Sequence, residues 1–286
     1  MFETLRNGFR LGSATRRLVF RDKGLLAYPI VMGILSVVEF VILFLGSLVL
    51  GGGLAAITGG VTPTLIVGVV AFYLASAFTT TYATIAMLLA FRSFVRGKKM
   101  GLREAFAAAR PYLTLAFEWA LFYTTVVMVL NLIESRFRGV ASLIISAVGS
   151  LALTVAIMFA VPAIVDNGAG PIKAVETSAK TLVRHFGATF GGIAYTDLYS
   201  IAIAFAGIVM IIAGAFSTYL SVFIGIPLIA LGIIVFAFGA ILGFALSNVF
   251  RFVLYEYVNG KPLPREFDEG LIRGSVRTRR QKTAVL

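Results

Sequence analysis

Six long apolar stretches constrain this chain more than any other feature. The hydrocarbon core of a bilayer is about 30 Å thick, so a helix of about 20 mainly apolar residues is needed to cross it. Stretches of that kind lie at residues 25–50, 64–91, 112–133, 140–165, 190–216 and 222–253. They predict an all-α, polytopic membrane bundle of about six transmembrane helices arranged as three hairpins.

Composition excludes the main alternatives. The chain is 59% hydrophobic and 13% charged, whereas an ordinary soluble domain is about 45–50% apolar and about 25% charged. A soluble globular enzyme, a disordered chain and a collagen-like fibre are therefore excluded. We expect a single integral membrane domain over residues 1–286, with a cytoplasmic interfacial segment at 1–24, the six-span bundle at 25–254 and a basic cytoplasmic tail at 255–286.

The distribution of basic residues predicts the orientation of the spans. Of the 25 Lys and Arg residues, 23 lie before the first stretch, after the second or fourth, or from the end of the sixth onward, where Arg251 is the first of them. The other two are Arg136 and Arg138. Because Lys and Arg concentrate in cytoplasmic loops, both termini are predicted to be cytoplasmic in the cell membrane. The first stretch is longer than the apolar region of a signal peptide, so we expect an uncleaved first helix.

The formal net charge of +12 has a simple explanation in this arrangement. Basic residues between membrane spans are attracted to anionic lipid headgroups, so no nucleic-acid partner is expected. Membrane lipids are the expected partners, and a protein partner or a second copy of the chain remains open. The candidate contacts for anionic lipid are Arg96, Lys98, Lys99, Arg103, Arg277, Arg279 and Arg280.

Three glycines follow the second, fourth and sixth stretches in similar positions. Gly97, Gly168 and Gly260 fit the residue after a helix end, where a left-handed conformation favours glycine. Segments 101–109 and 171–185 then have amphipathic spacing and predict short surface helices. Segment 261–270 contains proline and is expected to lie along the surface, and segment 2–20 predicts an interfacial N-terminal helix.

Three carboxylates lie inside the apolar stretches. Glu39 is near the middle of the first stretch, and Glu118 and Asp197 are near the cytoplasmic ends of the third and fifth. Ionisable groups are expensive within a membrane and suggest function by default. They could bind a proton, a cation or a basic ligand. Alternatively, Glu39 could bond to hydroxyls within residues 79–82, and the other two could pair with nearby arginines.

The last stretch carries small residues on one helical face. Gly225, Gly232, Gly239 and Gly243 are separated by steps of seven and four. Such a stripe allows two helices to approach closely. Its partner could be another helix of this chain or a second copy.

No constellation typical of an enzyme is present in the sequence. Cysteine is absent and His185 is the single histidine. The sequence also lacks a phosphate-binding glycine loop, an HExxH motif and a GxSxG motif. We therefore predict no catalytic residue, no metal ligand and no cofactor.

Three runs of the sequence form a recognisable pattern. The runs are VFRDKGLLAYP at 19–29, VPAIVD at 161–166 with GPIKAV at 170–175 and Ser178, and LYEYVNG at 254–260 with Pro264 and the Phe-Asp pair at 267–268. Together they resemble the DUF6159 family, prokaryotic integral membrane proteins of unknown function. Asp166 departs from the family pattern, in which the acidic residue comes slightly later. The resemblance implies a six-helix membrane protein and supplies no catalytic residue.

Two functions compete on these observations. The first is a non-enzymatic membrane protein, a scaffold or a lipid- or partner-binding component, that acts through its basic cytoplasmic segments. The second is a transporter of small solutes or lipids that uses Glu39, Glu118 and Asp197 around an internal cavity.

Overall fold

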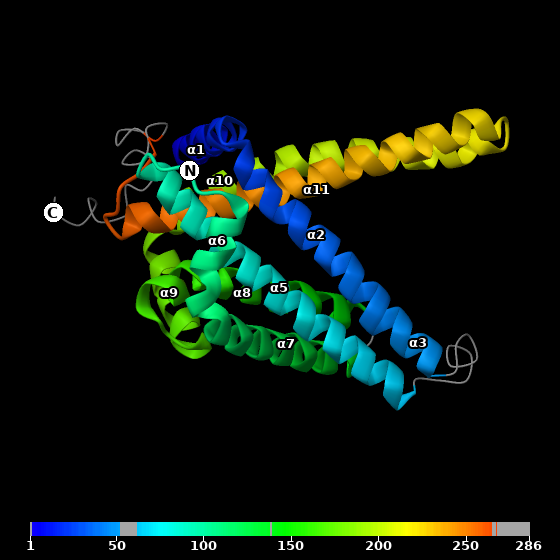
Figure 1. Ribbon diagram of the computed structural model, residues 1–286, viewed down its shortest axis with the longest axis horizontal. Helices are drawn as coiled ribbons and strands as arrows, with labels where there is room; N and C mark the ends of the chain where they lie inside the picture. The colour runs from blue at the N-terminus through cyan, green and yellow to red at the C-terminus, as the bar shows by residue number, and fades with distance from the viewer. Residues whose placement is uncertain (1, 52–61, 138, 265–266, 268–286) are drawn as a thin grey trace. The chain divides into compact units, whose positions relative to one another are not determined.

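A computed structural model describes residues 2–51, 62–137, 139–264 and 267. All regular structure in these residues is helical (Figure 1). Five helical segments are long and apolar enough to cross a membrane: Lys23–Leu50, Pro63–Val95, Leu102–Ser135, Tyr195–Thr218 and Val222–Val258. The predictions of an all-α fold and of a membrane protein are thus confirmed at this level.

The chain divides into two compact units. The central unit is Ile30–Leu182, and the terminal unit combines Met1–Pro29 with Val183–Leu286. Each is described by itself below.

In the central unit the long helix α5 (Pro63–Val95) is the element on which the others pack. It contacts α3 (Gly46–Leu50), α6 (Leu102–Ala109), α7 (Leu113–Ser135) and α9 (Ala160–Asn167). Its second half is the core, with Ile85, Ala86, Met87 and Leu88 fully buried. The remaining elements of this unit are α2 (Ala27–Glu39) from Ile30 onward, the π-helical η2 (Phe40–Leu45), η3 (Arg110–Tyr112), α8 (Val140–Ile157) and the start of α10 (Pro171–Thr218) as far as Leu182.

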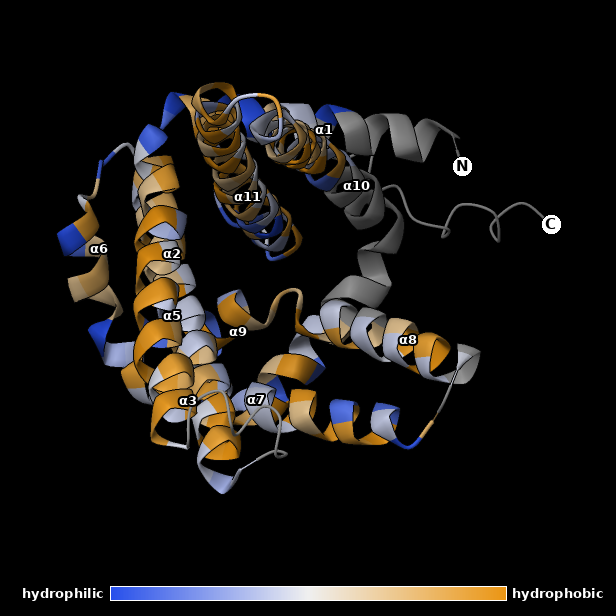
Figure 2. Cartoon of the chain, turned by 90° about the vertical axis from the view of Figure 1, so that its right-hand side faces the viewer, coloured by the Kyte–Doolittle hydropathy of each residue, from blue (hydrophilic) through white to orange (hydrophobic). Residues whose placement is uncertain are grey.

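The helices of the central unit are apolar on their outer faces as well. Figure 2 shows hydrophobic residues in orange along α2, α3 and α5. Val37, Ile42, Val49 and Val67 are between 63% and 73% exposed. Water-soluble monomers rarely expose contiguous apolar surface of this kind, so the natural solvent of this surface is lipid.

The terminal unit consists of α1 (Phe2–Arg21), η1 (Lys23–Leu26), the later part of α10 (Pro171–Thr218) and α11 (Val222–Val258). Residues 219–221 join α10 to α11, and the two helices run side by side as a long hairpin (Figure 1). Helix α1 packs on α11. On α1, Gly12 faces the ring of Tyr195 of α10 so closely that a side chain there would collide with it.

The three glycines expected at helix ends adopt the left-handed conformation. Gly97, Gly168 and Gly260 have φ of 79°, 56° and 67°, which confirms that prediction. After Gly97, the backbone N–H of Lys98 donates to the Ser93 carbonyl at 3.0 Å. After Gly260, the backbone N–H of Lys261 donates to the Glu256 carbonyl at 2.9 Å. Helices α5 and α11 therefore end in the same hydrogen-bonded turn.

The short helix predicted at 101–109 is present as α6 (Leu102–Ala109). Glu104 accepts a hydrogen bond from the Gly101 N–H at 3.1 Å, which satisfies an N–H at the helix start. The N-terminal helix is likewise present as α1, although side chains before Arg10 lie outside the described part. Of segment 261–270, residues 265–266 and 268–270 lie outside the described residues.

Two boundaries differ from the sequence prediction. The surface helix expected at 171–185 and the apolar stretch at 190–216 form one continuous helix, α10 (Pro171–Thr218). The stretch at 140–165, in contrast, is divided into α8 and α9 at Met158 and Phe159. The fully buried Ser178 hydroxyl accepts the Phe159 N–H at 2.8 Å, so a side chain of α10 satisfies the backbone at this break.

Candidate functional site

Glu39 lies at the junction of α2 with the π-helical η2 and is bonded to α5. Ser76 donates its hydroxyl hydrogen to one carboxylate oxygen at 3.1 Å, and Thr79 donates to the other. The structure therefore places a three-residue polar cluster between the first two membrane helices. Thr79 is among the partners that sequence analysis considered, whereas Ser76 is not.

The helical geometry changes at Glu39. The chain leaves α2 after this residue and continues for the six residues of η2 as a π-helix. Isolated π turns within helices are frequent at functional sites. The neighbours Leu35, Val38 and Ile42 are 43%, 46% and 64% exposed, so the carboxylate is set in an apolar, lipid-facing surface.

Glu118 has no comparable partner. It is exposed on α7 in the central unit, and among the described residues it makes no hydrogen bond and no ion pair. The pairing with Arg110 considered from the sequence is thus not formed. The Glu118 carboxylate faces Gly170, in the turn before α10, where an added Cβ would lie 3.8 Å from Glu118 Oε2.

Asp197 belongs to a polar cluster in the terminal unit. Ser247 of α11 donates its hydroxyl hydrogen to Asp197 Oδ1 at 2.6 Å. One turn after Ser247, the guanidinium of Arg251 interacts electrostatically with Asp197. Sequence analysis did not connect Ser247 or Arg251 with Asp197, because nothing local reveals that α10 carries their partner.

The small-residue stripe of α11 packs against α10 of the same chain. A Cβ added at Gly232 would lie 2.7 Å from the Ile211 backbone nitrogen, and one at Gly239 would lie 2.6 Å from that of Ala204. Gly225 faces Thr218 and Gly243 faces Ser200. Of the two partners left open by the sequence, the structure places the intramolecular one at this face.

Helix α10 contributes its own glycines to the same interface, and sequence analysis missed them. A Cβ at Gly207 would lie 2.7 Å from the Gly232 carbonyl oxygen, and one at Gly214 would lie 2.7 Å from the Ile229 nitrogen. The interval of seven residues between Gly207 and Gly214 is the signal that could have revealed them.

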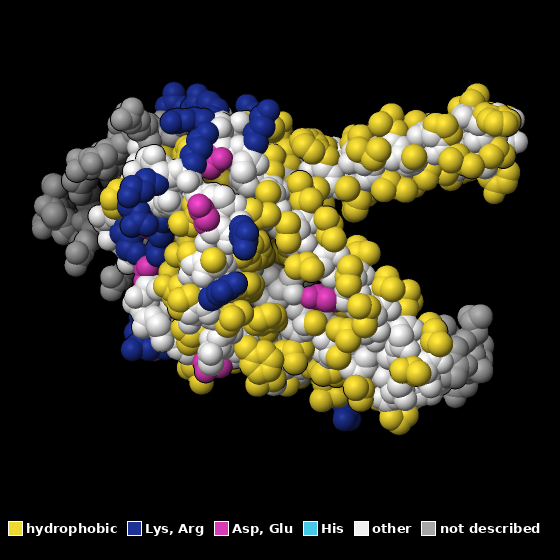
Figure 3. All heavy atoms as spheres, viewed as in Figure 1, with side chains coloured by type: hydrophobic (Ala, Val, Ile, Leu, Met, Phe, Trp, Pro, Cys, Tyr) yellow, Lys and Arg dark blue, Asp and Glu magenta, His cyan; other side chains and the backbone are white. Residues whose placement is uncertain are grey.

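Basic side chains gather around the connection between α5 and α6. Arg96, Lys98, Lys99 and Arg103 are all exposed. In contrast, no dark blue side chain is visible on the outer part of the α10–α11 hairpin in Figure 3. The tail candidates Arg277, Arg279 and Arg280 lie outside the described residues.

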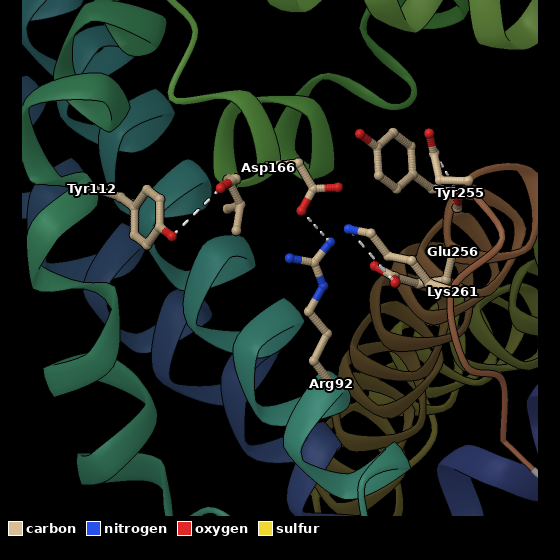
Figure 4. Close-up of polar contacts among 8 residues, drawn as sticks. Arg92, Tyr112, Asp166, Tyr255, Glu256 and Lys261 are labelled. Carbon is tan, nitrogen blue, oxygen red and sulfur yellow. Dashed lines mark hydrogen bonds and ion pairs between the residues drawn. The ribbon is translucent and has the colours of Figure 1, made fainter.

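Two contacts of α9 in the central unit stabilise the surroundings of this basic connection. Arg92 and Asp166 form an ion pair of 2.8 Å, with side chains 16% and 17% exposed. Tyr112 donates its hydroxyl hydrogen to the Val165 carbonyl at 3.5 Å (Figure 4). Asp166, where the sequence departs from the family pattern, therefore has a structural partner.

Two further lysines have local acidic partners. In the terminal unit Lys261 Nζ lies 3.9 Å from Glu256 and 5.8 Å from the centre of the Tyr255 ring. At the start of α10, the Lys180 ammonium lies 2.5 Å from the Glu176 carboxylate. The hydrogen bond and the charge of Lys180 lower the pKa of Glu176. Among the described residues, no group of three or more His, Asp or Glu side chains could hold a metal ion.

Together these features define an all-helical membrane protein with carboxylates inside its spans and exposed basic residues at helix ends. The family model of DUF6159, a family of unknown function, matches residues 63–262. The chain therefore belongs to the DUF6159 family. No curated protein and no solved structure matches it.

Proposed function

We propose that this chain is a six-span protein of the cell membrane with both termini in the cytoplasm. It acts without catalysis, as a scaffold that binds anionic lipid or a partner through basic segments at its cytoplasmic helix ends. A second copy of the chain is one such partner.

The observation that carries the proposal is the set of basic side chains between α5 and α6. Arg96, Lys98, Lys99 and Arg103 are exposed, and none of them forms an ion pair with another described residue. Arg92, in contrast, is paired with Asp166. Each free Lys or Arg near an anionic surface contributes about 1 kcal/mol of attraction.

The proposal needs one span in addition to the five long apolar segments, and this span is α8, the fourth in chain order. Its 18 residues extend for about 27 Å at 1.5 Å per residue, close to the thickness of the hydrocarbon core. With α8 crossing the membrane, the ends of α5, α9 and α11 are on the same side. That side is cytoplasmic by the distribution of Lys and Arg.

Neutralising the four basic residues of the α5–α6 connection is expected to weaken the binding of anionic lipid at least about tenfold. The variant carries Arg96→Gln, Lys98→Gln, Lys99→Gln and Arg103→Gln. The measurement is the amount of phosphatidylglycerol retained by the full-length protein on release from nanodiscs, by native mass spectrometry. Retention by the wild type should fall with added salt.

Single substitutions provide the matched control. Arg96→Gln and Arg136→Gln remove the same charge, but the proposed topology places Arg136 on the opposite side. Arg96→Gln should reduce the amount of phosphatidylglycerol that the protein retains, and Arg136→Gln should leave that amount unchanged. Equal retention by the wild type and the fourfold variant would rule out this cluster as the lipid-binding site. The same test applies to Arg277, Arg279 and Arg280.

The alternative function, a transporter of small solutes or lipids, is supported by the Glu39 cluster. A carboxylate that bonds two hydroxyls of a neighbouring helix beside a π-helix has the composition of a proton- or cation-binding site. In this alternative Glu118 and Asp197 are the other two candidate carboxylates for binding the transported species.

Glu39 is expected to react with dicyclohexylcarbodiimide, which modifies carboxyl groups in apolar surroundings. The adduct should be found at Glu39 by peptide mass spectrometry, and Glu39→Gln should lose it.

Proton uptake by proteoliposomes, driven by a potassium diffusion potential, should also be lost in Glu39→Gln and Asp197→Asn. Glu176→Gln, at an exposed carboxylate outside the spans, is the control for both measurements. Normal uptake by the Glu39→Gln, Asp197→Asn double variant would exclude the transporter.

A further inference from the structure

Arg251 is a charged residue inside α11 whose hydrogen bonding is incomplete. Its Nε is buried and has no hydrogen-bond partner in the described part of the chain. A guanidinium carries five N–H donors in a fixed plane. Leaving one of them buried and unbonded is costly, so an acceptor is expected at this position.

The carboxylate of Asp197 does not supply that acceptor. Asp197 interacts with Arg251 electrostatically, yet among the described residues no ion pair or hydrogen bond joins the two side chains. The carboxylate is instead held by the Ser247 hydroxyl, at 2.6 Å from Oδ1. Oδ2 makes no hydrogen bond to the described residues. The cluster thus contains one cationic donor and one anionic acceptor, both incompletely bonded.

The surrounding backbone holds the two charges in place. Ser247 and Arg251 are four residues apart on α11 and therefore lie on the same face. Gly243, one turn earlier on that face, is packed against Ser200 of α10. Since Ser200 is three residues after Asp197, the close contact fixes the register of the two helices at this level.

The depth of the cluster indicates the kind of molecule that can reach it. Ser200 is level with Gly243, which is 21 residues after the start of α11 at Val222, and Asp197 lies three residues farther along the hairpin. At 1.5 Å per residue, Asp197 and Arg251 are therefore about 36 and 44 Å from the start of α11. The hydrocarbon core is about 30 Å thick. If the hairpin spans the bilayer as proposed above, the cluster lies at the level of the lipid headgroups.

We propose that Asp197, Ser247 and Arg251 form a binding site for the headgroup of a zwitterionic phospholipid that carries a primary ammonium. Arg251 donates to the phosphate, and Asp197 Oδ2 accepts an N–H of the ammonium. The trimethylated ammonium of phosphatidylcholine has no N–H to donate. Phosphatidylglycerol has no cation for Asp197. The site therefore selects phosphatidylethanolamine.

The test is a competition between lipids on the full-length protein. Wild type and variants are placed in nanodiscs containing equal parts of phosphatidylethanolamine, phosphatidylcholine and phosphatidylglycerol. Native mass spectrometry then identifies the lipids retained. The wild type should retain phosphatidylethanolamine over phosphatidylcholine by about tenfold, the effect of one hydrogen bond to a charged group.

Each variant has its own expected result. Asp197→Asn should remove most of the preference for phosphatidylethanolamine over phosphatidylcholine, and Arg251→Gln should reduce retention of both. Ser247→Ala releases Asp197 toward Arg251, so retention should also fall, and this milder change covers the case in which Arg251→Gln does not fold. Glu176→Gln, which neutralises an exposed carboxylate outside the spans, is the control and should behave as the wild type.

Equal retention of the two lipids by the wild type would overturn the proposal, and so would an Asp197→Asn variant that remains as selective as the wild type. The fourfold variant of the α5–α6 connection should keep the preference for phosphatidylethanolamine while losing phosphatidylglycerol. A failure of this site is therefore distinguishable from a failure of the proposed scaffold function.

Discussion

Replacing Gly207 with alanine is expected to destabilise the protein by about 3 kcal/mol, the upper end of the usual range for overpacking. The added methyl group would meet the backbone nitrogen of Phe236, and it would lie 2.7 Å from the Gly232 oxygen and 2.8 Å from the Phe236 Cα. Backbone atoms cannot rotate away as a side chain can, so α10 and α11 must separate. Every other close glycine contact along the hairpin weakens when they do.

The measurement is the free energy of unfolding in detergent micelles or bilayers, with Gly33→Ala and Gly46→Ala as controls. Both control glycines are helical, and an added Cβ meets nothing within 4 Å. Alanine in a helix interior is favoured over glycine by up to about 1 kcal/mol, so the controls should be neutral or stabilising. A Gly207→Ala variant as stable as Gly33→Ala would show that the two helices are not in direct contact.

Removing the Ser178 hydroxyl should destabilise the protein by about 1–3 kcal/mol, the cost of a buried donor without a partner. Ser178 and Phe159 are both fully buried, and the hydroxyl accepts the Phe159 N–H at the break between α8 and α9. No other acceptor for this N–H is expected in lipid, where water cannot replace the lost bond.

The unfolding free energies of Ser178→Ala and Ser150→Ala provide the comparison. Ser150 is exposed on α8, so its change should stay within about 0.5 kcal/mol. Ser178→Thr, which keeps the hydroxyl, should recover part of the lost stability. If Ser178→Ala and Ser150→Ala are equally stable, the hydrogen bond at the break contributes nothing.

Features that depend on local chemistry were predictable from the sequence. The left-handed glycines at 97, 168 and 260 follow from the preference of helix ends for glycine. Helix α6 follows from its amphipathic spacing, with Glu104 at the position that caps its start. Long apolar stretches gave the class of fold for the same reason, because each span satisfies its own backbone in lipid.

Helix boundaries were less predictable. The sequence changes from polar to apolar near residues 186–189, but no proline is present there. The helix therefore continues through these residues as α10. At Met158 and Phe159 the break precedes Pro162, in the first turn of α9, which has no N–H for the Met158 carbonyl and cannot continue the preceding helix. The Phe159 N–H exposed by the break is bonded by Ser178, a tertiary partner that no local pattern reveals.

The candidate site was predictable only in part. Glu39 was conspicuous because a carboxylate is rare within an apolar stretch, but Ser76 lies 37 residues away along the chain. Asp197 and Ser247 are separated by 50 residues. Their contact depends on the register of α10 against α11, which the packed glycines fix.

The short connection at 219–221 has a consequence for how the protein enters the membrane during synthesis. Its three residues, Tyr219, Leu220 and Ser221, are uncharged, so carrying them across the bilayer requires no charge to pass through the hydrocarbon. The two helices on either side already contact each other backbone to backbone. We therefore expect α10 and α11 to leave the translocon together, as a preassembled pair that needs no other part of the chain to insert.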